Sequence, residues 1–382
     1  MSDTKHPTLF SEVRIDSLTL ANRAAVAPMT RTSAAEEGIV TDQMVTYYQR
    51  YARGGFGLVI TEGTFTDTAY SQGYYRQPGI ATDAQAAAWR PVVEGVHEAG
   101  AAIVVQLMHA GAQRQYNGYC EGSVAPSAVA PYGNTKPMYH GDGDVFAVPE
   151  ALSETQLIEV IDGFVASAKR AMAAGFDGVE IHAANGYLLD EFLTDYHNQR
   201  TDDYGGSMGN RLRMVRKVLT SVRDAVGGDF TVGIRLSQIK INDTEYRWAD
   251  ADEAATIFRT VAEAGASYIH VTGAGAVEPA FSGDPRSLTE LASEYSKVAV
   301  ITNGALHEAT AAEEQLVKHG ATVVAVGRGA LMDADWPARV RADKPLHAFD
   351  FDLLQPLATL DSQANWEAAH DDVFEPLAQR NG

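Results

Sequence analysis

Short apolar segments rich in β-branched residues alternate with longer amphipathic stretches along most of the chain. This alternation is typical of successive strand–helix units, which build a parallel sheet. Eight segments fit the pattern, and eight parallel strands close an α/β barrel. The expected strands are residues 24–29, 56–63, 102–109, 178–184, 230–237, 268–275, 298–304 and 321–329. The sequence therefore predicts a (β/α)₈ barrel.

The stretches between the expected strands carry signals for helix starts and ends. Residues Thr82–Gln85, Ser153–Gln156 and Asp250–Glu253 have the spacing of a capping box, which satisfies backbone N–H groups at a helix N-terminus. A glycine ends a helix because it adopts left-handed dihedral angles without a Cβ clash. Such glycines precede four of the expected strands, at positions 100, 175, 265 and 320.

Three segments stand outside this repeat. Residues 13–22 alternate apolar and polar side chains around a turn, which predicts a small N-terminal hairpin plugging the lower end of the barrel. Residues 110–152 are rich in Gly, Pro, Ser and Tyr and leave the C-terminal end of a strand, so we expect them to roof an active site. We interpret 1–382 as a single domain, with the barrel at about 22–344 and a C-terminal arm of open role at 345–382.

Composition narrows the function classes. The formal net charge of -20 argues against nucleic-acid and membrane partners, because both need clustered Lys and Arg. The first residues show no basic segment leading into an apolar run, so we expect a cytoplasmic protein. Cys120 is the single cysteine, which excludes an internal disulfide, a CxxC redox motif and a four-cysteine iron–sulfur cluster.

Three polar residues stand near the C-terminal ends of the expected strands, where barrel enzymes carry their functional groups: Gln106, His182 and Arg235. The two-residue period of a strand points all three into the barrel. A guanidinium in an apolar barrel mouth is costly unless something accepts its hydrogen bonds, and a ligand is one such acceptor. A structural ion pair of Arg235 with Glu180 or Glu62 is the alternative, and the two are compatible.

Two expected strands end in glycine turns that enter helices, ITNGAL at 301–306 and VGRGAL at 326–331. Barrels commonly bind phosphate at this position through backbone N–H groups. Arg328, between two glycines, supplies a matching cation. A purely structural turn is the alternative, but the arginine favours a phosphate-bearing cofactor.

His182, Asn185 and Tyr187 lie within six residues and combine two hydrogen-bond donors with a weak acid. Each alone would more often be a packed side chain, so only their combination indicates a site. His109 and His270 could join His182 on a zinc ion, but the chain lacks an HExxH motif or a close histidine pair, and we expect no metal.

Six motifs, in order, resemble the Old Yellow Enzyme family of flavin-dependent ene-reductases. The resemblance runs from about residue 8 to about residue 340, and six motifs on eight strands are more specific than any one of them. The motifs are NRAAVAPMTR (22–31), GYYRQPGI (73–80), QLMHAG (106–111), HAANGYLLDEFL (182–193), NQRTDDYGGSMGNRLR (198–213) and VGRGALMDADWP (326–337).

The resemblance implies non-covalent FMN across the strand ends and NAD(P)H as reductant. Gln106 and Arg235 would lie at the flavin's pyrimidine edge, where reduced flavin carries negative charge that an inward cation stabilises. Gly304, Gly327 and Arg328 would hold the phosphate. The full set implied for FMN is Pro28, Met29, Thr30, Gly63, Gln106, His182, Arg235, Asn303, Gly304, Gly327 and Arg328.

The resemblance also implies how a substrate is reduced. His182 and Asn185 would hold a carbonyl or nitro oxygen while hydride from flavin N5 reaches the β carbon, and Tyr187 would protonate the α carbon. The substrate class would be α,β-unsaturated carbonyls, nitroalkenes and quinones, reduced in a ping-pong cycle. Tyr74 and Met108 would form pocket walls.

Several positions depart from the family pattern. Thr30 stands where some relatives have cysteine, Met108 where many have tryptophan, and Ala112 where they often have arginine. The arm at 345–382 also lacks the usual pattern, so substrate choice and the choice between monomer and homo-oligomer stay open. With one cysteine and this length, we expect neither the iron–sulfur cluster nor the second nucleotide-binding domain of some larger relatives.

Two other functions compete with an ene-reductase. A dihydroorotate-type flavin dehydrogenase would use a Ser or Cys base in a loop. A non-catalytic flavin-binding barrel would be expected to have lost one of His182, Asn185 and Tyr187. The presence of all three therefore favours the ene-reductase.

Overall fold

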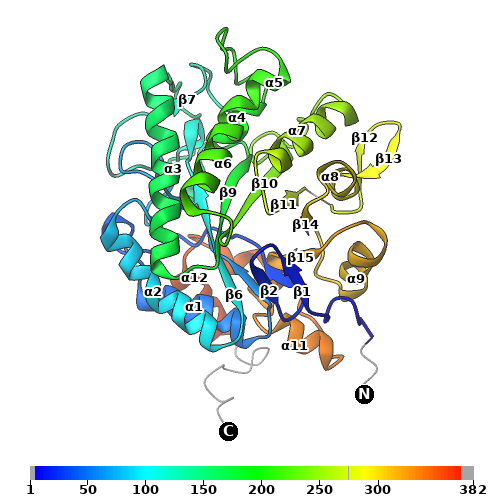
Figure 1. The fold of residues 1–382 in the computed structure, drawn as a ribbon. Coiled ribbons are helices and arrows are strands. Elements are labelled where there is room, and N and C mark those ends of the chain that lie inside the picture. Colours follow the sequence, from blue (N-terminus) through cyan, green and yellow to red (C-terminus); the bar gives the residue numbers. More distant parts are fainter. Residues whose placement is uncertain (1–4, 274, 371–382) are drawn as a thin grey trace.

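The computed structural model describes residues 5–273 and 275–370, and its centre is a closed barrel of eight parallel strands (Figure 1). Each strand pairs with the next around the ring, and the pairing of β15 with β3 and of β4 with β6 completes the closure. All eight expected strands are confirmed. They are β3 (Ala24–Val26), β4 (Leu58–Ile60), β6 (Ala102–Met108), β9 (Gly178–Asn185), β10 (Thr231–Lys240), β11 (Tyr268–Thr272), β14 (Ala299–Asn303) and β15 (Val323–Val326).

Helices surround the barrel on its outer face (Figure 1). The longer ones are α1 (Asp42–Arg53), α2 (Asp83–Glu98), α3 (Glu154–Ala174), α6 (Arg213–Val226), α7 (Ala251–Glu263), α8 (Leu288–Ser296), α9 (Ala309–Lys318) and α12 (Leu360–Ala369). Short helices follow several strands: α4 (Leu188–Leu193), α5 (Met208–Arg211), α10 (Arg328–Met332) and α11 (Trp336–Arg341). Two small hairpin strands, β12 (Pro279–Phe281) and β13 (Asp284–Ser287), follow β11.

The predicted helix caps are largely observed. Thr82 and Ser153 form reciprocal capping boxes at the starts of α2 and α3. Asp250 caps α7, but the reciprocal bond of a capping box, from the Asp250 N–H to the Glu253 side chain, is not formed. Glu253 instead accepts the N–H of Ala249 with one carboxylate oxygen and pairs with an arginine of α5 through the other. The four predicted glycines have φ angles between 77° and 98°, in the left-handed region. A further box at Ser287, starting α8, was not predicted.

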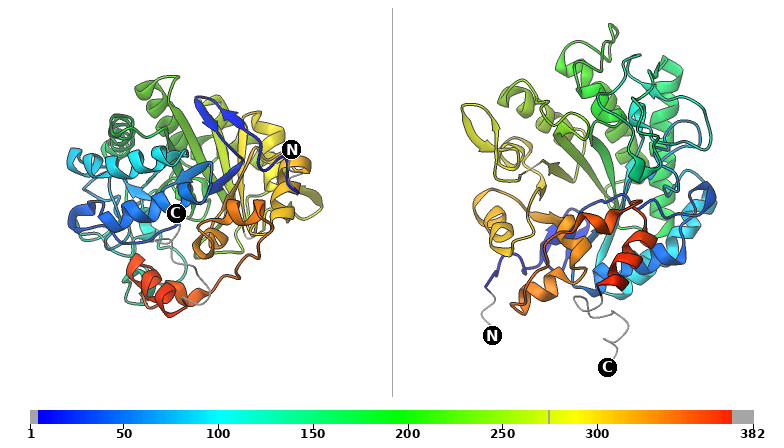
Figure 2. Two further views of the ribbon diagram at one scale, coloured as in Figure 1. Left: turned by 90° about the horizontal axis from the view of Figure 1, so that it is seen from below. Right: turned by 180° about the vertical axis from the view of Figure 1, so that it is seen from behind.

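The N-terminal hairpin fills the lower end of the barrel, as predicted. Strands β1 (Val13–Ile15) and β2 (Leu18–Leu20) pair antiparallel. Ile15, Leu18 and Leu20 are at most 4% exposed and pack against interior residues of the barrel such as Leu58 and Ile60. In the view from below, the blue hairpin lies across this end (Figure 2). Because the hairpin closes this end of the barrel, a ligand would have to enter at the opposite end.

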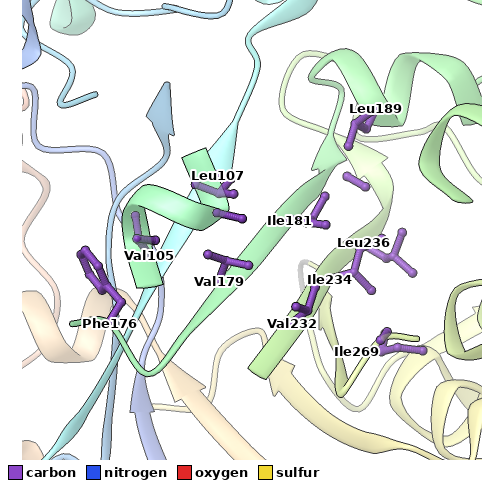
Figure 3. Close-up of a cluster of buried hydrophobic side chains, with 14 of the residues drawn as sticks. Val105, Leu107, Phe176, Val179, Ile181, Leu189, Val232, Ile234, Leu236 and Ile269 are labelled. Atoms are coloured by element: carbon purple, nitrogen blue, oxygen red, sulfur yellow. The ribbon is translucent and has the colours of Figure 1, made fainter. Parts of the chain in front are cut away.

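Alternation along the strands divides apolar from polar side chains. Val179 and Ile181 of β9, like Ile234 and Leu236 of β10, belong to the apolar layer between strands and helices (Figure 3). The residue between Val179 and Ile181 and the residue between Ile234 and Leu236 face into the barrel. Gln106 is in register with Glu180, and Arg235 is in register with both His182 and His270, so these polar groups meet inside the barrel.

Two segments cover the carboxyl ends of the strands. The loop 110–152 contains β7 (Val124–Ala125) and β8 (Glu150–Ala151). The C-terminal arm returns across the barrel and packs α12 near α1, with an ion pair of 3.0 Å between Arg50 and Glu367 (Figure 2). No helix in the described ranges is both long and apolar enough to cross a membrane.

Candidate active site

A cavity of about 550 Å³ opens at the carboxyl ends of the barrel strands. This volume is in the range of small-molecule and cofactor sites. Every residue assigned to FMN from the sequence lines it, from Pro28, Met29 and Thr30 after β3 to Gly327 and Arg328 after β15. Met108, His182, Asn185 and Tyr187 line the same cavity. The fold thus brings together residues that are separated by up to 300 positions in the chain.

Glycines allow close approach at two points of this cavity. A Cβ on Gly63 would lie 2.4 Å from the sulfur of Met108. Gly304 has φ +144° and a Cβ there would lie 2.9 Å from the carbonyl oxygen of Gly273, so a side chain is excluded on both grounds. Gly327 differs, because its nearest neighbour would be 3.7 Å away. A glycine is therefore sterically required at position 304 but not at position 327.

Arg235 is 4% exposed, and its guanidinium has hydrogen-bonding capacity to spare. One terminal nitrogen lies 3.1 Å from Nε2 of His270 and the other donates to Oδ1 of Asn303 at 3.1 Å. Its Nε is buried without a partner among the described residues. Burial lowers the pKa of Arg235 to about 10, so the group is still a cation at neutral pH. An uncompensated donor at a cavity wall suits an anionic or acceptor-rich ligand.

The two carboxylates considered as ion-pair partners of Arg235 bind other groups. Glu180 accepts from Gln106 at 2.8 Å and from Tyr268 at 3.1 Å, and lies 2.8 Å from Nδ1 of His270. Burial followed by the charge of Arg235 lowers the pKa of His270 to about 4, so this imidazole is neutral. Burial raises the pKa of Glu180, but the contact with His270 and the nearby cation outweigh it and keep the carboxyl ionised. His270 thus lies between Glu180 and Arg235 and contacts both.

Glu62, the other carboxylate, supports the segment that follows Thr30. Its side chain accepts the backbone N–H groups of Arg31 at 2.9 Å and Thr32 at 3.2 Å, and its second oxygen lies 3.1 Å from the Tyr48 hydroxyl. Burial raises the pKa of Glu62 to about 7. This support was not predicted, because it joins residues 30 positions apart through a turn that the sequence does not specify.

His182 presents a neutral imidazole to the cavity. Burial, reinforced by Arg235, lowers its pKa to about 3. Its Nδ1 is buried without a partner in the described part of the chain. The ring lies 5.1 Å from the ring of Tyr187, centroid to centroid. A neutral imidazole can donate one hydrogen bond to a ligand oxygen without bringing a charge.

Asn185 and Tyr187 complete this wall. Asn185 adopts left-handed dihedral angles, with φ +64°, at the carboxyl end of β9. Tyr187 is 4% exposed, its hydroxyl contacts the hydroxyl of Tyr74, and burial raises its pKa above the usual value. Tyr74 is not among the residues that line the cavity, but it packs in one cluster with Met108 and Tyr187, which do. Its role as a pocket wall stays a prediction.

Several lining residues were not predicted from the sequence. Tyr139 comes from the roof loop, and its ring lies 5.0 Å from the ring of Tyr74. The arm contributes His347, Phe349 and Leu354, and the guanidinium of Arg328 lies over the Phe349 ring at 5.8 Å. Sequence periodicity contains no signal for these contacts, because they depend on where loops settle over the barrel.

The three histidines considered for zinc do not assemble. Nδ1 of His109 accepts the N–H of Gly111 at 3.1 Å, and His270 is held by Glu180 and Arg235. Within residues 5–273 and 275–370, no group of three or more His, Cys, Asp or Glu side chains is arranged to hold a metal ion.

Comparison with known proteins gives consistent matches over most of the chain. The family model described as NADH:flavin oxidoreductase / NADH oxidase matches residues 8–347. The chain is 34% identical over 351 residues to the NADH oxidase of Thermoanaerobacter brockii, covering 88% of this chain and 51% of that protein, so it spans about half of that longer relative. It is 33% identical over 345 residues to a probable flavin mononucleotide-dependent alkene reductase of Leishmania infantum, covering 87% and 89% of the two chains.

A solved structure is also similar. The Old Yellow Enzyme homologue from Zymomonas mobilis superposes with a TM-score of 0.83 at 30% identity, covering 93% of this chain and 99% of that one. The similarity therefore extends over the whole barrel and the segments that cover it.

Proposed function

The chain belongs to the NADH:flavin oxidoreductase / NADH oxidase family, the Old Yellow Enzyme family of FMN-dependent oxidoreductases, and we propose that it is an NAD(P)H-dependent ene-reductase. Its substrates would be alkenes activated by a carbonyl or nitro group. The observation that carries the proposal is that His182, Asn185 and Tyr187 share one cavity with the residues assigned to FMN. Two hydrogen-bond donors and one acid would thus face the same bound molecule.

The donor set of the cavity fits FMN. Arg235, whose Nε has no partner in the described part of the chain, and Gln106 offer hydrogen bonds to the acceptors of a flavin ring. At the other end, Arg328 offers a cation, and Gly304 and Gly327 line the cavity with backbone alone, which suits a phosphate. When bound, FMN would supply redox chemistry, taking a hydride from NAD(P)H and giving it to the alkene.

On the substrate side, His182 and Asn185 would donate hydrogen bonds to the carbonyl or nitro oxygen. These donors draw electron density toward the oxygen and make the β carbon electrophilic, and they stabilise the charge that develops there. The neutral state of His182 suits this role, because a hydrogen bond rather than a proton is needed.

Tyr187 would deliver the proton to the α carbon. Its raised pKa keeps the hydroxyl protonated at neutral pH, so the proton is available when the carbanion-like carbon forms. The hydroxyl of Tyr74 contacts the same oxygen and would supply a hydrogen bond to it after the transfer. Both tyrosines are buried, which limits exchange of this proton with water.

The test is reconstitution followed by stopped-flow kinetics of the two half-reactions. The purified chain should bind one non-covalent FMN, be reduced by NADH or NADPH, and be reoxidised without oxygen by cyclohexenone, a nitroalkene or a quinone. Binding of FMN without reoxidation by any of these acceptors would indicate a non-catalytic flavin-binding barrel instead.

A spectral titration tests the oxygen-binding pair. Phenols such as 4-hydroxybenzaldehyde imitate the enolate oxygen, so replacing both His182 and Asn185 by Ala should weaken phenol binding by at least about tenfold. Unchanged phenol affinity in this double variant would remove the two residues from the proposed role.

A further inference from the structure

A buried ion pair lies directly behind the turn that carries Asn185 and Tyr187. Nζ of Lys240 is 2.6 Å from Oδ1 of Asp190, and the two side chains are 2% and 0% exposed. The other oxygen of Asp190 accepts the backbone N–H of Gly186 at 2.7 Å. Burying two charges is costly, and an apolar pair of similar volume is often equally stable. The pair therefore calls for an explanation other than stability.

The turn itself has an uncommon backbone conformation. Asn185 and Gly186 are both left-handed, with φ angles of +64° and +87°. For a residue with a Cβ this conformation costs on the order of 1 kcal/mol and persists where surrounding bonds impose it. The direction of the Asn185 amide into the cavity depends on this conformation, because a change of φ would swing the side chain away.

Bonds from two other segments, β10 with the residue after it and the loop after β6, hold the same turn. The N–H of Asn185 donates to Oγ of Ser237 at 2.8 Å. Its carbonyl oxygen accepts from Gln113 at 2.8 Å and from the N–H of Ile241 at 3.1 Å. Both backbone groups of Asn185, its N–H and its carbonyl, therefore have partners. The next N–H, that of Gly186, is bound by Asp190.

A bulge in β10 brings Lys240 to this position. Leu236 pairs with Ala183, but the next paired residue is Lys240, opposite Asn185, so four residues of β10 pass two of β9. The ammonium of Lys240 also lies 4.6 Å from the centre of the Tyr246 ring. The bulge thus places one cation between Asp190 and an aromatic face, immediately behind the turn.

We propose that Asp190 and Lys240 are positioning residues for the substrate-oxygen site: Asp190 fixes the left-handed turn through the Gly186 N–H, and Lys240 holds Asp190 in place by compensating its charge. The inference rests on the proposed function, since it takes Asn185 and Tyr187 as the groups that face the substrate. Neither member of the pair touches the cavity itself.

Two double variants separate positioning from simple stability. Both remove both charges, so neither leaves a buried charge unpaired. Asp190→Asn with Lys240→Met keeps an oxygen that can accept the Gly186 N–H. Asp190→Leu with Lys240→Met keeps the volume and removes the acceptor. The readouts are the dissociation constant of 4-hydroxybenzaldehyde on the FMN-loaded protein, the rate of reoxidation by cyclohexenone, and FMN affinity.

The asparagine variant should bind the phenol within about threefold of wild type, whereas the leucine variant should bind at least about tenfold more weakly. Reoxidation of the leucine variant should slow by about 10- to 100-fold, since small misplacements of catalytic groups have effects of this size. FMN affinity should be unchanged in both. A matched control is Arg211→Met with Glu253→Leu, which removes another pair of 2.7 Å, with side chains 9% and 14% exposed, and should leave phenol binding unchanged.

Equal phenol affinity in the two Asp190 variants would overturn the inference. If the leucine variant does not fold, Asp190→Ala with Lys240→Met provides the second test, because it removes the same acceptor of the Gly186 N–H with a smaller side chain. A folded protein of this kind with wild-type phenol affinity would also overturn the inference. A wild-type protein that binds FMN but no phenol would instead contradict the proposed function, and the inference with it.

Discussion

At the scale of single residues, protonation states determine what the cavity wall can do. His182 and Tyr187 lie side by side, but burial acts on them in opposite directions: it lowers the pKa of the imidazole and raises that of the phenol. Both groups are therefore neutral and both carry a proton at pH 7. One can donate a hydrogen bond and the other can act as an acid, and each role can be tested by itself.

Tyr187→Phe should slow only the half-reaction that consumes a proton. The substitution keeps the ring and removes the hydroxyl, so reduction by NAD(P)H should proceed near the wild-type rate. Reoxidation by cyclohexenone should slow by about 10² to 10⁴, the range for a lost general acid. Nitroalkenes should be less affected, because a nitronate is stable enough to take its proton from water. Stopped-flow traces in which both half-reactions slow equally would contradict the role of Tyr187.

The depressed pKa of His182 predicts that this residue makes no contribution to the pH dependence of the rate near neutrality. Burial and Arg235 hold this pKa at about 3, so the imidazole does not gain a proton between about pH 5.5 and pH 8. Cyclohexenone has no titrating group, and the ratio of the wild-type and His182→Gln rates of reoxidation cancels the titration of Glu62, whose pKa is about 7. This ratio should vary by less than about threefold over this range. A roughly tenfold fall as the pH drops through 6.5, absent in His182→Gln, would show that His182 titrates normally.

The same shift has a consequence for stability. His182 is neutral in the folded protein, whereas the unfolded chain binds a proton near pH 6.5. Below that pH the unfolded state therefore binds more protons, and the contribution of this residue to stability is lost as the pH falls from 6.5 toward 3.

At the scale of elements, the turns after β14 and β15 supply the proposed phosphate site. Arg328→Glu should weaken FMN binding by about 10- to 100-fold, because it replaces a phosphate partner by a like charge at an exposed position where solvent screens part of the effect. Arg341→Glu in α11 is a matched control, since it makes the same charge change outside the cavity lining. Equal FMN dissociation constants for the two variants, measured by fluorescence, would remove Arg328 from the site.

The N-cap of helix α3, Ser153, was predicted from the sequence, and its contribution to the stability of the barrel can be measured. Ser153 accepts the N–H of Gln156, and Gln156 returns a bond to the Ser153 N–H. Ser153→Ala should lower the free energy of unfolding by about 1 kcal/mol, the usual cost of a lost N-cap. Urea denaturation measures this change, and FMN affinity should stay the same. A change smaller than about 0.3 kcal/mol would mean that water replaces the cap at this end.

At the scale of the whole molecule, cofactor binding should stabilise the barrel as a unit. The cavity is lined from β6, β9, β10 and β14 and from the loops after β3 and β15, so one ligand would contact most of the ring. At free FMN about 100-fold above its dissociation constant, the folded state should gain about 2.7 kcal/mol. Thermal unfolding should therefore shift upward by several degrees when FMN is added to the cofactor-free protein. A melting temperature independent of FMN would contradict binding in this cavity.

The eight strands, the helix caps and the hairpin were predictable because each depends on local periodicity or on one turn. The inward direction of Gln106, His182 and Arg235 follows from the two-residue period of a strand in the same way. Contacts between distant segments were not predictable. The sequence did not predict that the Tyr74 hydroxyl contacts that of Tyr187, or that Tyr139 of the roof loop packs against the Tyr74 ring.

The sequence by itself determined the barrel, the family motifs and the residue types available at the strand ends, because these are encoded in spacings of a few residues. The tertiary structure alone decided which charges meet inside the barrel and what closes the cavity. His270 comes between Glu180 and Arg235, Lys240 reaches Asp190 through a bulge, and the arm delivers Phe349 to the cavity. Each depends on strand register, on a bulge or on the path of a loop, which are set by packing over the whole molecule and leave no periodic trace in the chain.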